Sequence, residues 1–499
     1  MTNRPPTAYA ELEGRFARLS HVNGARAVLS WDHQAMMPEG GAEARADQLA
    51  TLAVLAHEML TDPRHGDLLD RAEGETLDDW QRANLAEMRR QWRHATAVES
   101  ALVETLSKAV SASEHAWREA RPANDFKGFA PKLARVLELV REVAARKAAA
   151  LGVGPYDALL DEYEPGGSSA AIDAIFDDLE AFLPGFLGEV MELQARRGRA
   201  HAPAGPFAVE RQRALGERVM RTMGFDFRHG RLDVSRHPFC GGTPDDVRIT
   251  TRYDEADFTS ALMGVIHETG HALYEMGLPR PWRSQPVGQP RGMSLHESQS
   301  LLMEMQACRS REFIGFAAPL MREAFGGEGA AWEADNLYRL YTHVEPGFIR
   351  VDADEVTYPA HVILRYKLER AMIAGELRVA DLPGAWAEGM QRMLGIVPPD
   401  DRLGCMQDIH WPDGAWGYFP TYTLGALTAA QLFAAARKAD PGIPAAIGRG
   451  DFGPLVAWLR ANVHGLASSL PTPEILRRAT GRPLETLAFK AHLRQRYLA

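Results

Sequence analysis

Residues 267–271 of this 499-residue chain have the sequence His-Glu-Thr-Gly-His, and no other segment constrains the local structure as strongly. Two histidines four positions apart lie on one face of an α-helix, so both imidazoles can reach a single metal ion. Glu268 then stands beside the position that the ion leaves open for water. The pattern predicts a metal-binding helix whose chemistry is peptide hydrolysis.

The residues around this motif favour the helix that it requires. Asp257 or Thr259 can cap the start, and Gly277 with Pro279 can end it. Between these limits, apolar residues recur at spacings of three, four and seven: Leu262, Val265, Ile266 and Leu273.

A third metal ligand has to come from elsewhere in the chain. A catalytic zinc ion takes three protein ligands and keeps one position for water. A third histidine close behind the motif is excluded, because Tyr274 and Gly277 stand where that pattern needs a glycine and a histidine. A carboxylate from a following helix is the other solution, and Glu297 within residues 294–300 is the first choice.

Local sequence leaves two interpretations of Glu297 open. Ser294 followed three positions later by Glu297 is also the pattern of a capping box, in which both side chains bond to backbone at a helix start. The apolar pattern that follows predicts a helix through Leu301, Leu302, Met305 and Cys308. Two further acids are lesser candidates for the ligand: Glu304 and Glu275.

Several phrases of the chain resemble the carboxypeptidase Taq family of metallocarboxypeptidases. The resemblance rests on the 267–271 motif, the 26-residue step from His271 to Glu297, and the His-Glu-Ser context of Glu297. Further phrases match in the same order: 237–239, 246–250, 349–350 with 353–355, 407–411 and 418–422. Weaker likeness at residues 31–38 and 156–166 extends the resemblance over most of the chain.

This resemblance implies a homodimeric, zinc-dependent enzyme that removes single residues from peptides with a free C-terminus, with broad specificity. It implies three ligands for zinc, which Co²⁺ can replace: His267, His271 and Glu297. Glu268 is the expected general base, and the resemblance points to His410 and Tyr422 as donors to the tetrahedral oxygen. Without the family resemblance, a histidine next to Trp411 and a tyrosine in the aromatic segment 416–422 would more often be core residues.

A free C-terminal carboxylate suits a planar guanidinium, which can hold it with two parallel hydrogen bonds. Arg350 is the first choice because it lies in the 349–355 phrase, and Arg248 is the second. Four acids in the matching phrases are expected to orient arginine or histidine partners: Asp246, Asp354, Glu355 and Asp408.

Helical periodicity covers most of the chain. One clear stripe is Phe129, Leu133, Val136, Leu137 and Val140, and this helix should end at Gly152. Alternation over 247–253 predicts a β-strand, whose edge could hold an extended peptide, although a minor structural hairpin fits equally well.

The expected fold is therefore mainly α: a large multi-helix single domain with a deep active-site cleft and a small β-sheet beside the zinc helix. No long linker or repeat divides residues 1–499. Along this domain we expect a helical part at about 1–230, the zinc and substrate motifs at 237–425, and C-terminal helices at 426–499.

Composition narrows the possible partners. The net charge is −10, from 56 basic and 66 acidic residues without a basic block, which argues against nucleic acid as a partner. The chain lacks an apolar stretch of about 18 residues for a membrane span, and residues 1–14 lack the apolar core of a signal peptide, so we expect a cytoplasmic protein. Three cysteines without paired spacing are expected to be buried free thiols: Cys240, Cys308 and Cys405.

Two other functions stay open at the level of sequence. The same motif with a distant glutamate also serves oligopeptidases that cut internal bonds. The spacing does not show whether the active-site cleft is closed beyond the scissile bond. The second is a non-catalytic helical scaffold with a structural metal. Glu268 argues against the scaffold, because a structural zinc ion has a closed fourth position and needs no general base.

Overall fold

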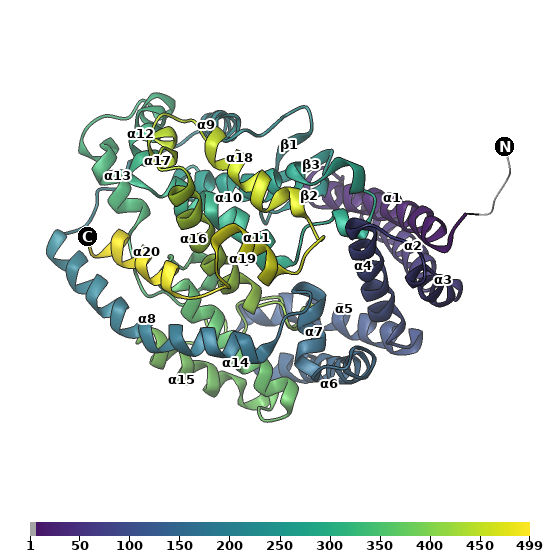
Figure 1. Ribbon diagram of the computed structural model, residues 1–499. Helices are drawn as coiled ribbons and strands as arrows, with labels where there is room; N and C mark the ends of the chain where they lie inside the picture. The colour runs from purple at the N-terminus through teal and green to yellow at the C-terminus, as the bar shows by residue number, and fades with distance from the viewer. Residues whose placement is uncertain (1–5) are drawn as a thin grey trace.

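The computed structural model describes residues 6–499, most of which are helical, with one small sheet (Figure 1). The expectation that no signal peptide is present concerns residues 1–14, and the first five of these lie outside the described residues. The mainly α fold with a small β-sheet is confirmed. Among the helices of residues 6–499, none has both the length and the apolar character that a membrane crossing requires.

The first four helices form a separate layer with its own small apolar cluster. They are α1 (Ala8–Ala35), α2 (Ala42–Leu60), α3 (Arg64–Glu73) and α4 (Asp79–Thr96). Leu12, Leu69 and Met88 are buried at the centre of this cluster. Figure 1 shows the layer at one side of the molecule, next to the sheet.

A second layer is built on a larger apolar cluster. Its helices are α5 (Ser100–Ala123), α6 (Phe126–Leu151), α7 (Pro155–Tyr163), α8 (Ser169–Arg197), α14 (Tyr358–Ala374) and α15 (Leu382–Leu394). The predicted stripe of α6 is buried in this cluster, and the helix ends as predicted at Gly152, which has a φ of 74°. Glycine adopts this left-handed conformation without steric cost.

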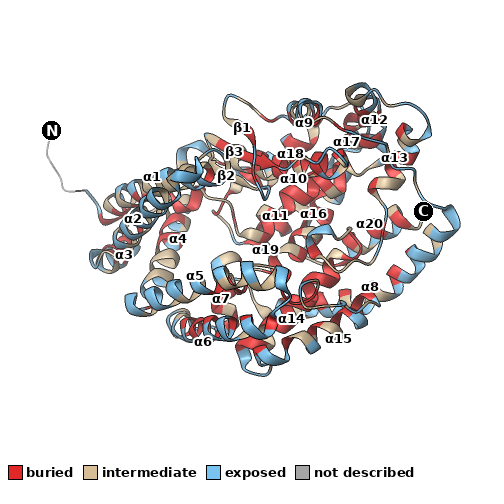
Figure 2. Ribbon diagram, turned by 180° about the vertical axis from the view of Figure 1, so that it is seen from behind, coloured by how far each residue is buried: buried red, intermediate tan, exposed pale blue. Residues whose placement is uncertain are grey.

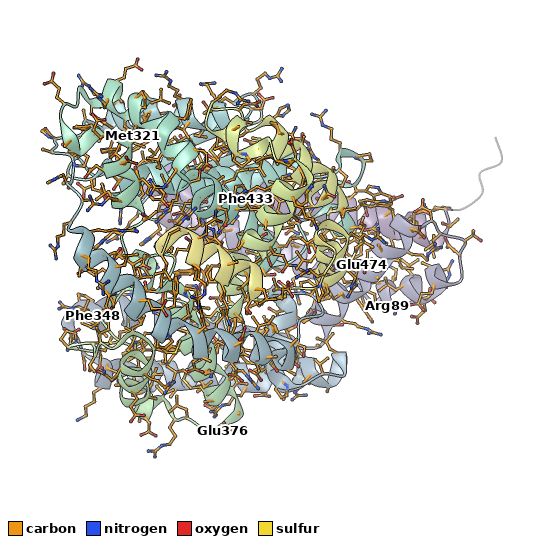
Figure 3. The ribbon with its side chains drawn as sticks, turned by 60° about the vertical axis from the view of Figure 1, so that its left-hand side comes forward. Arg89, Met321, Phe348, Glu376, Phe433 and Glu474 are labelled. Atoms are coloured by element: carbon orange, nitrogen blue, oxygen red, sulfur yellow. The ribbon has the colours of Figure 1, made fainter. Side chains whose placement is uncertain are left out.

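The third layer holds the metal motif. It comprises α9 (Val209–Met223), α10 (Phe258–Gly277), α11 (Met293–Leu301), α12 (Arg311–Phe325), α13 (Ala334–Tyr341), α17 (Ile443–Ile447), α18 (Gly453–Asn462) and α19 (Thr472–Thr480). Met321 and Phe433, both labelled in Figure 3, belong to its apolar cluster. The last helix, α20 (Leu487–Tyr497), instead buries Phe489, Leu493 and Tyr497 in the cluster of the second layer.

Helix α16 (Pro420–Ala439) joins the second and third layers. Leu424 and Leu427 lie in the cluster of the second layer, whereas Leu432 and Phe433 lie in that of the third. Figure 2 shows α10, α11 and α16 as largely buried ribbons at the centre of the molecule. This shared helix favours one domain for these two layers. The extent of that domain over residues 1–499 and its three expected parts stay predictions.

The sheet has three strands in the order β1-β3-β2: β1 (Gly230–Val234), β2 (Cys240–Thr243) and β3 (Asp246–Thr251). β3 pairs with β1 in parallel and with β2 antiparallel. The predicted strand is present, but its interpretation as a peptide-binding edge is wrong, because β3 is the central strand. β2 takes an edge position through a local turn, which the alternation of 247–253 could not show.

Helix α10 follows the sequence prediction closely. It begins after Asp257, whose side chain accepts a hydrogen bond from the Thr259 amide at 2.8 Å, and it ends at Gly277. Of its apolar stripe, Leu262, Ile266 and Leu273 lie in the third-layer cluster, and Val265 packs with the apolar residues of the sheet. A Cβ atom on Gly270 would lie 2.5 Å from the carbonyl oxygen of Gln299 on α11, so these two helix backbones are in close contact.

We predict that Gly270→Ala lowers the stability of the fold by about 1–3 kcal/mol, because the added methyl group meets backbone atoms that cannot move aside. Gly264→Ala is the matched control on the same helix, since a Cβ there meets no atom within 4 Å. The control should unfold no earlier than the wild type, as alanine favours helix. Equal unfolding midpoints of the two variants in urea would contradict the close contact.

Candidate metal centre and active site

Three side chains from two helices converge on one point. His267 and His271 project from the same face of α10, and Glu297 projects from α11. Oε2 of Glu297 lies 3.4 Å from Nε2 of His271 and 3.9 Å from Nε2 of His267. Their potential ligand atoms all lie within 4.8 Å of one another. Two imidazole nitrogens and one carboxylate oxygen at such distances fit the ligand set of a catalytic metal site.

Two glycines allow Glu297 to approach the histidines. Gly270 brings α10 against the backbone of α11, as described above. On the opposite side, a Cβ atom on Gly425 of α16 would lie 2.8 Å from Cβ of Glu297. Glu297 is therefore confined between two helices, and its side chain is only 11% exposed.

The capping-box interpretation of Glu297 is wrong. α11 begins at Met293 after Gly292, which has a φ of 66°, and no side chain caps its start. The Ser294 hydroxyl instead donates to the buried carboxylate of Glu164. The predicted continuation through Cys308 is present, but residues Leu302–Cys308 form a π-helix.

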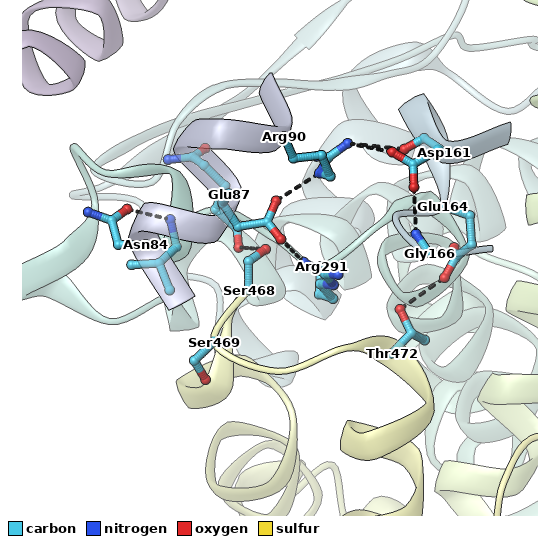
Figure 4. Close-up of polar contacts among 12 residues, drawn as sticks. Asn84, Glu87, Arg90, Asp161, Glu164, Gly166, Arg291, Ser468, Ser469 and Thr472 are labelled. Carbon is cyan, nitrogen blue, oxygen red and sulfur yellow. Dashed lines mark hydrogen bonds and ion pairs between the residues drawn. The ribbon is translucent and has the colours of Figure 1, made fainter. Parts of the chain in front are cut away.

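Buried polar contacts hold the segment that leads into α11 (Figure 4). Glu87 of α4 forms an ion pair with Arg291, and Glu164, just after α7, accepts from the Ser294 amide at 3.2 Å and from the Thr472 hydroxyl at 2.9 Å. These contacts join parts of the chain that are far apart in sequence. They fix the start of the helix that carries Glu297.

A second carboxylate orients His267. Oε2 of Glu304 lies 2.9 Å from Nδ1 of His267, and Nη2 of Arg309 donates to Oε1 of Glu304 at 2.6 Å. Glu304 was a lesser candidate for the metal ligand, but the structure leaves it out of the ligand cluster. Since Nδ1 of His267 faces a carboxylate, its Nε2 is available to a metal ion.

His271 is oriented through another histidine. Nδ1 of His296 lies 2.7 Å from Nδ1 of His271, and Nε2 of His296 lies 2.9 Å from Oε1 of Glu275. Glu275, the other lesser candidate, is thus linked to the ligand cluster only through His296. This contact of His296 was not predicted from the sequence, although His296 directly precedes Glu297 in the matching phrase.

Glu268 lies beside the ligand cluster and is buried, with 7% of the residue exposed. Burial raises the pKa of its carboxyl group to about 7. A carboxylate whose pKa lies near neutrality can take and release a proton under ordinary conditions.

The predicted polar residues of the 349–355 and 407–422 phrases also converge. Nε2 of His410 and the hydroxyl of Tyr422 are 3.0 Å apart. The Arg350 guanidinium lies 4.8 Å from the centre of the Tyr422 ring, and its Nη2 donates to Asp408 at 2.7 Å. Burial lowers the pKa of His410 to about 4, so this imidazole is neutral near pH 7.

Arg248, the second choice for binding the carboxylate, lies on β3. It pairs with Asp246 at 2.7 Å, and its guanidinium lies 4.2 Å from the centre of the Trp31 ring of α1.

Glu355 has the partners expected of it. It contacts Arg496 and His492 of α20 at 2.9 and 2.8 Å.

Two expectations about supporting residues need correction. Asp354 does not orient an arginine or a histidine. Its carboxylate accepts hydrogen bonds from the backbone amides of Val356 and Thr357, because Asp354 lies directly before the first turn of α14. Cys240 is a free thiol, as are Cys308 and Cys405, but it is only partly buried.

A cavity of about 1120 Å³ lies on the β2 side of the site. It is bounded by α1, by β2 and by the segment before α11, with these residues among its lining: Phe16, Asn23, Cys240, Gly241, Glu275 and Gln289. Glu275 connects this cavity to His296, but His267, Glu268, His271 and Glu297 do not line it.

A helix-borne His-Glu-x-x-His motif with a glutamate ligand candidate from the next helix defines a metallopeptidase site. A model of the carboxypeptidase Taq (M32) metallopeptidase family matches residues 11–497, and the chain belongs to this family. It is 39% identical to thermostable carboxypeptidase 1 of Thermus thermophilus over 99% of both chains.

Solved structures agree with this assignment. Metallocarboxypeptidase 1 of Trypanosoma cruzi is 41% identical, with a TM-score of 0.97 and 99% of each chain covered. The M32 carboxypeptidase of Deinococcus radiodurans is 37% identical, with a TM-score of 0.93 and 98% of each chain covered. The protein is a peptide hydrolase with carboxypeptidase activity, and its family implies a metal ion. The scaffold alternative is wrong.

We predict that Glu304→Ala weakens the binding of a divalent metal ion by about 10- to 100-fold, because His267 loses the carboxylate that orients its ring. Competition with a chromogenic chelator measures this affinity. Glu312→Ala, at an exposed position of α12, is the control and should leave it unchanged. Wild-type affinity in Glu304→Ala would show that Glu304 does not support the ligand.

Proposed function

We propose that this carboxypeptidase uses zinc, held by His267, His271 and Glu297, to release single residues from the free C-terminus of peptides with broad specificity. The observation that carries the proposal is the convergence of these three donors next to Glu268. When bound, zinc would lower the pKa of a water molecule toward about 7 and polarise the scissile carbonyl, and Co²⁺ could replace it.

Glu268 is the proposed general base. It is adjacent in sequence to His267 and is buried beside the ligand cluster. Its carboxylate would accept a proton from the attacking water and pass it to the leaving amine.

His410 and Tyr422 are proposed to stabilise the oxyanion. Hydroxyl and imidazole donors placed where negative charge develops lower the barrier to acyl transfer. Their mutual distance of 3.0 Å fixes the orientation of the Tyr422 hydroxyl. Because burial raises the pKa of Tyr422 to about 12, this hydroxyl keeps its proton and can donate a hydrogen bond to the oxyanion.

Arg350 is proposed to bind the C-terminal carboxylate of the peptide. Nε and Nη2 of its guanidinium donate to Asp408, which leaves Nη1 directed toward the Tyr358 hydroxyl at 3.3 Å. Arg350 is 5% exposed, so a carboxylate that reaches it is shielded from water and held strongly. Arg248 stays the second choice, because it lies against Trp31 of α1, whereas Arg350 lies beside Tyr422.

An oligopeptidase that cuts internal bonds remains the second candidate. The cavity of about 1120 Å³ at β2 would support it if a peptide extended from the ligand cluster past His296 and Glu275 into that cavity. A carboxypeptidase would use the same space for the body of its peptide. The two functions therefore differ only in whether the free carboxylate is required.

The cellular setting is likewise a proposal. We infer a cytoplasmic homodimer with peptides as its only macromolecular ligands. Free thiols at Cys308 and Cys405 suit a reducing compartment. Exposed apolar side chains at Val54 and Leu55 of α2 are available to a second copy, and light scattering would test the dimer.

We predict that Glu268→Gln keeps zinc and loses at least about a thousandfold in kcat, because the amide cannot take up the proton. Zinc content by atomic absorption and peptide hydrolysis would be measured on the same preparation. Glu323→Gln, on the exposed face of α12, is the control. Near wild-type turnover of Glu268→Gln would remove this residue from the mechanism.

We predict that Arg350→Met raises KM for a peptide with a free C-terminus by about 100-fold or more while zinc content stays unchanged. The physical reason is the loss of a buried, charge-assisted hydrogen bond to the carboxylate. An equal effect on the corresponding C-terminal amide would reject the assigned role, and the oligopeptidase would then be favoured.

A further inference from the structure

Two buried arginines share one carboxylate next to the candidate active site. Nε of Arg365, on α14, donates to Oδ2 of Asp408 at 2.6 Å. Nε and Nη2 of Arg350 donate to Oδ1 of the same carboxylate at 3.1 and 2.7 Å. Within residues 6–499 neither arginine forms an ion pair with any other acid. This triad of Arg350, Asp408 and Arg365 thus holds one more positive charge than negative charge.

The groups that face the triad leave this balance unchanged. Burial lowers the pKa of His361 to about 3 and that of His410 to about 4, so both imidazoles are neutral near pH 7. Tyr358 and Tyr422 keep their protons, since burial raises the pKa of both hydroxyls. The surplus positive charge is therefore not cancelled by the adjacent side chains.

Burial makes this surplus expensive. The side chain of Arg365 is 0% exposed, and those of Arg350 and Asp408 are 7% and 12% exposed. Away from water, a charge without a full counter-charge destabilises the fold. Burial and the adjacent Arg350 accordingly lower the pKa of Arg365 to about 10. Costs of this kind are characteristic of functional sites.

Surrounding residues hold Arg365 in place. Its Nη1 donates to the carbonyl oxygen of His361 at 2.8 Å, and its guanidinium lies 4.5 Å from the centre of the Trp386 ring. No described protein atom accepts a hydrogen bond from its Nη2. The side chain cannot turn toward solvent, so its charge acts on whatever Asp408 and Arg350 face.

Asp408 has two effects on Arg350 that oppose each other. It orients the guanidinium through two hydrogen bonds, and its negative charge cancels the positive charge that a substrate carboxylate would bind. Arg365 offsets the second effect, because its positive charge also pairs with the carboxylate of Asp408, through Oδ2. Arg350 then keeps both its orientation and an attractive field.

We propose that Arg365 is a positioning residue that sets the affinity of the active site for a C-terminal carboxylate. It acts through Asp408 and Arg350 and does not itself touch the peptide. The substrate carboxylate brings the buried group to neutrality. This inference rests on the proposed function, in which Arg350 binds that carboxylate.

The test compares ligands that differ only in charge. Inhibition of the zinc-loaded enzyme would be measured with 3-phenylpropionate and with 3-phenylpropionamide, alongside KM and kcat for a blocked dipeptide. The variants are R365M, which removes the charge; R365K, which keeps it; and R365M/D408N, which restores the net charge of the triad. R378M removes an arginine whose side chain is 79% exposed and serves as the control.

We expect R365M to raise the inhibition constant of phenylpropionate and the KM of the dipeptide by about tenfold, with kcat and the constant of the amide changing by less than about threefold. R365K and R378M should stay near the wild type, and R365M/D408N should bind phenylpropionate more tightly than R365M. If R365M does not fold, R365Q carries the same expectation.

Equal weakening of the acid and the amide in R365M would overturn the proposal, as would a double variant no better than R365M. Either result would leave Arg365 as a structural link between α14 and the segment that contains Asp408. Arg350→Met separates this failure from that of the proposed function. If Arg350→Met loses the preference for the acid and R365M keeps it, only the inference about Arg365 is wrong.

Discussion

The close approach of α11 to α10 and α16 is the contact on which the rest of the site depends. It is possible because Gly270 and Gly425 carry no side chain. A Cβ atom on Gly270 would lie 2.5 Å from the backbone of α11, and one on Gly425 would lie 2.8 Å from Cβ of Glu297. A methyl group at either position would displace Glu297 from His271. Since α16 also contributes to both large apolar clusters, the burial that stabilises the fold and the geometry of the metal ligands are set by the same helices.

Around this contact, buried carboxylates orient the groups that do the chemistry. Glu304 faces His267, Glu275 reaches His271 through His296, and Asp408 holds Arg350. Each of these acids is partnered, which limits the energetic cost of its burial. The arrangement gives both histidines one nitrogen for a metal ion and gives Arg350 a fixed direction. The N-terminal helices contribute through Glu87, which anchors the segment entering α11.

Local sequence predicts those parts of the structure that local interactions decide. The cap at Asp257, the end at Gly277 and the apolar stripe of α10 all follow from spacing, as does the end of α6 at Gly152. Partners distant in sequence could not be inferred in this way. The Ser294 hydroxyl bonds to Glu164 instead of capping its own helix, and β3 lies between two other strands, because tertiary contacts outweighed the local patterns. Arg365 carried no signal, since nothing in its neighbourhood distinguishes it from other helical arginines.

The central claim is that metal-dependent cleavage begins at a free C-terminal carboxylate. The most direct measurement is mass spectrometry of two peptides that are identical except for a free or an amidated C-terminus. Each is incubated with the zinc-loaded protein and with a chelated sample. Stepwise loss of single residues from the free peptide alone, abolished by chelation, is the predicted result. Internal cuts in both peptides, or cleavage that survives complete removal of the metal, would contradict the account.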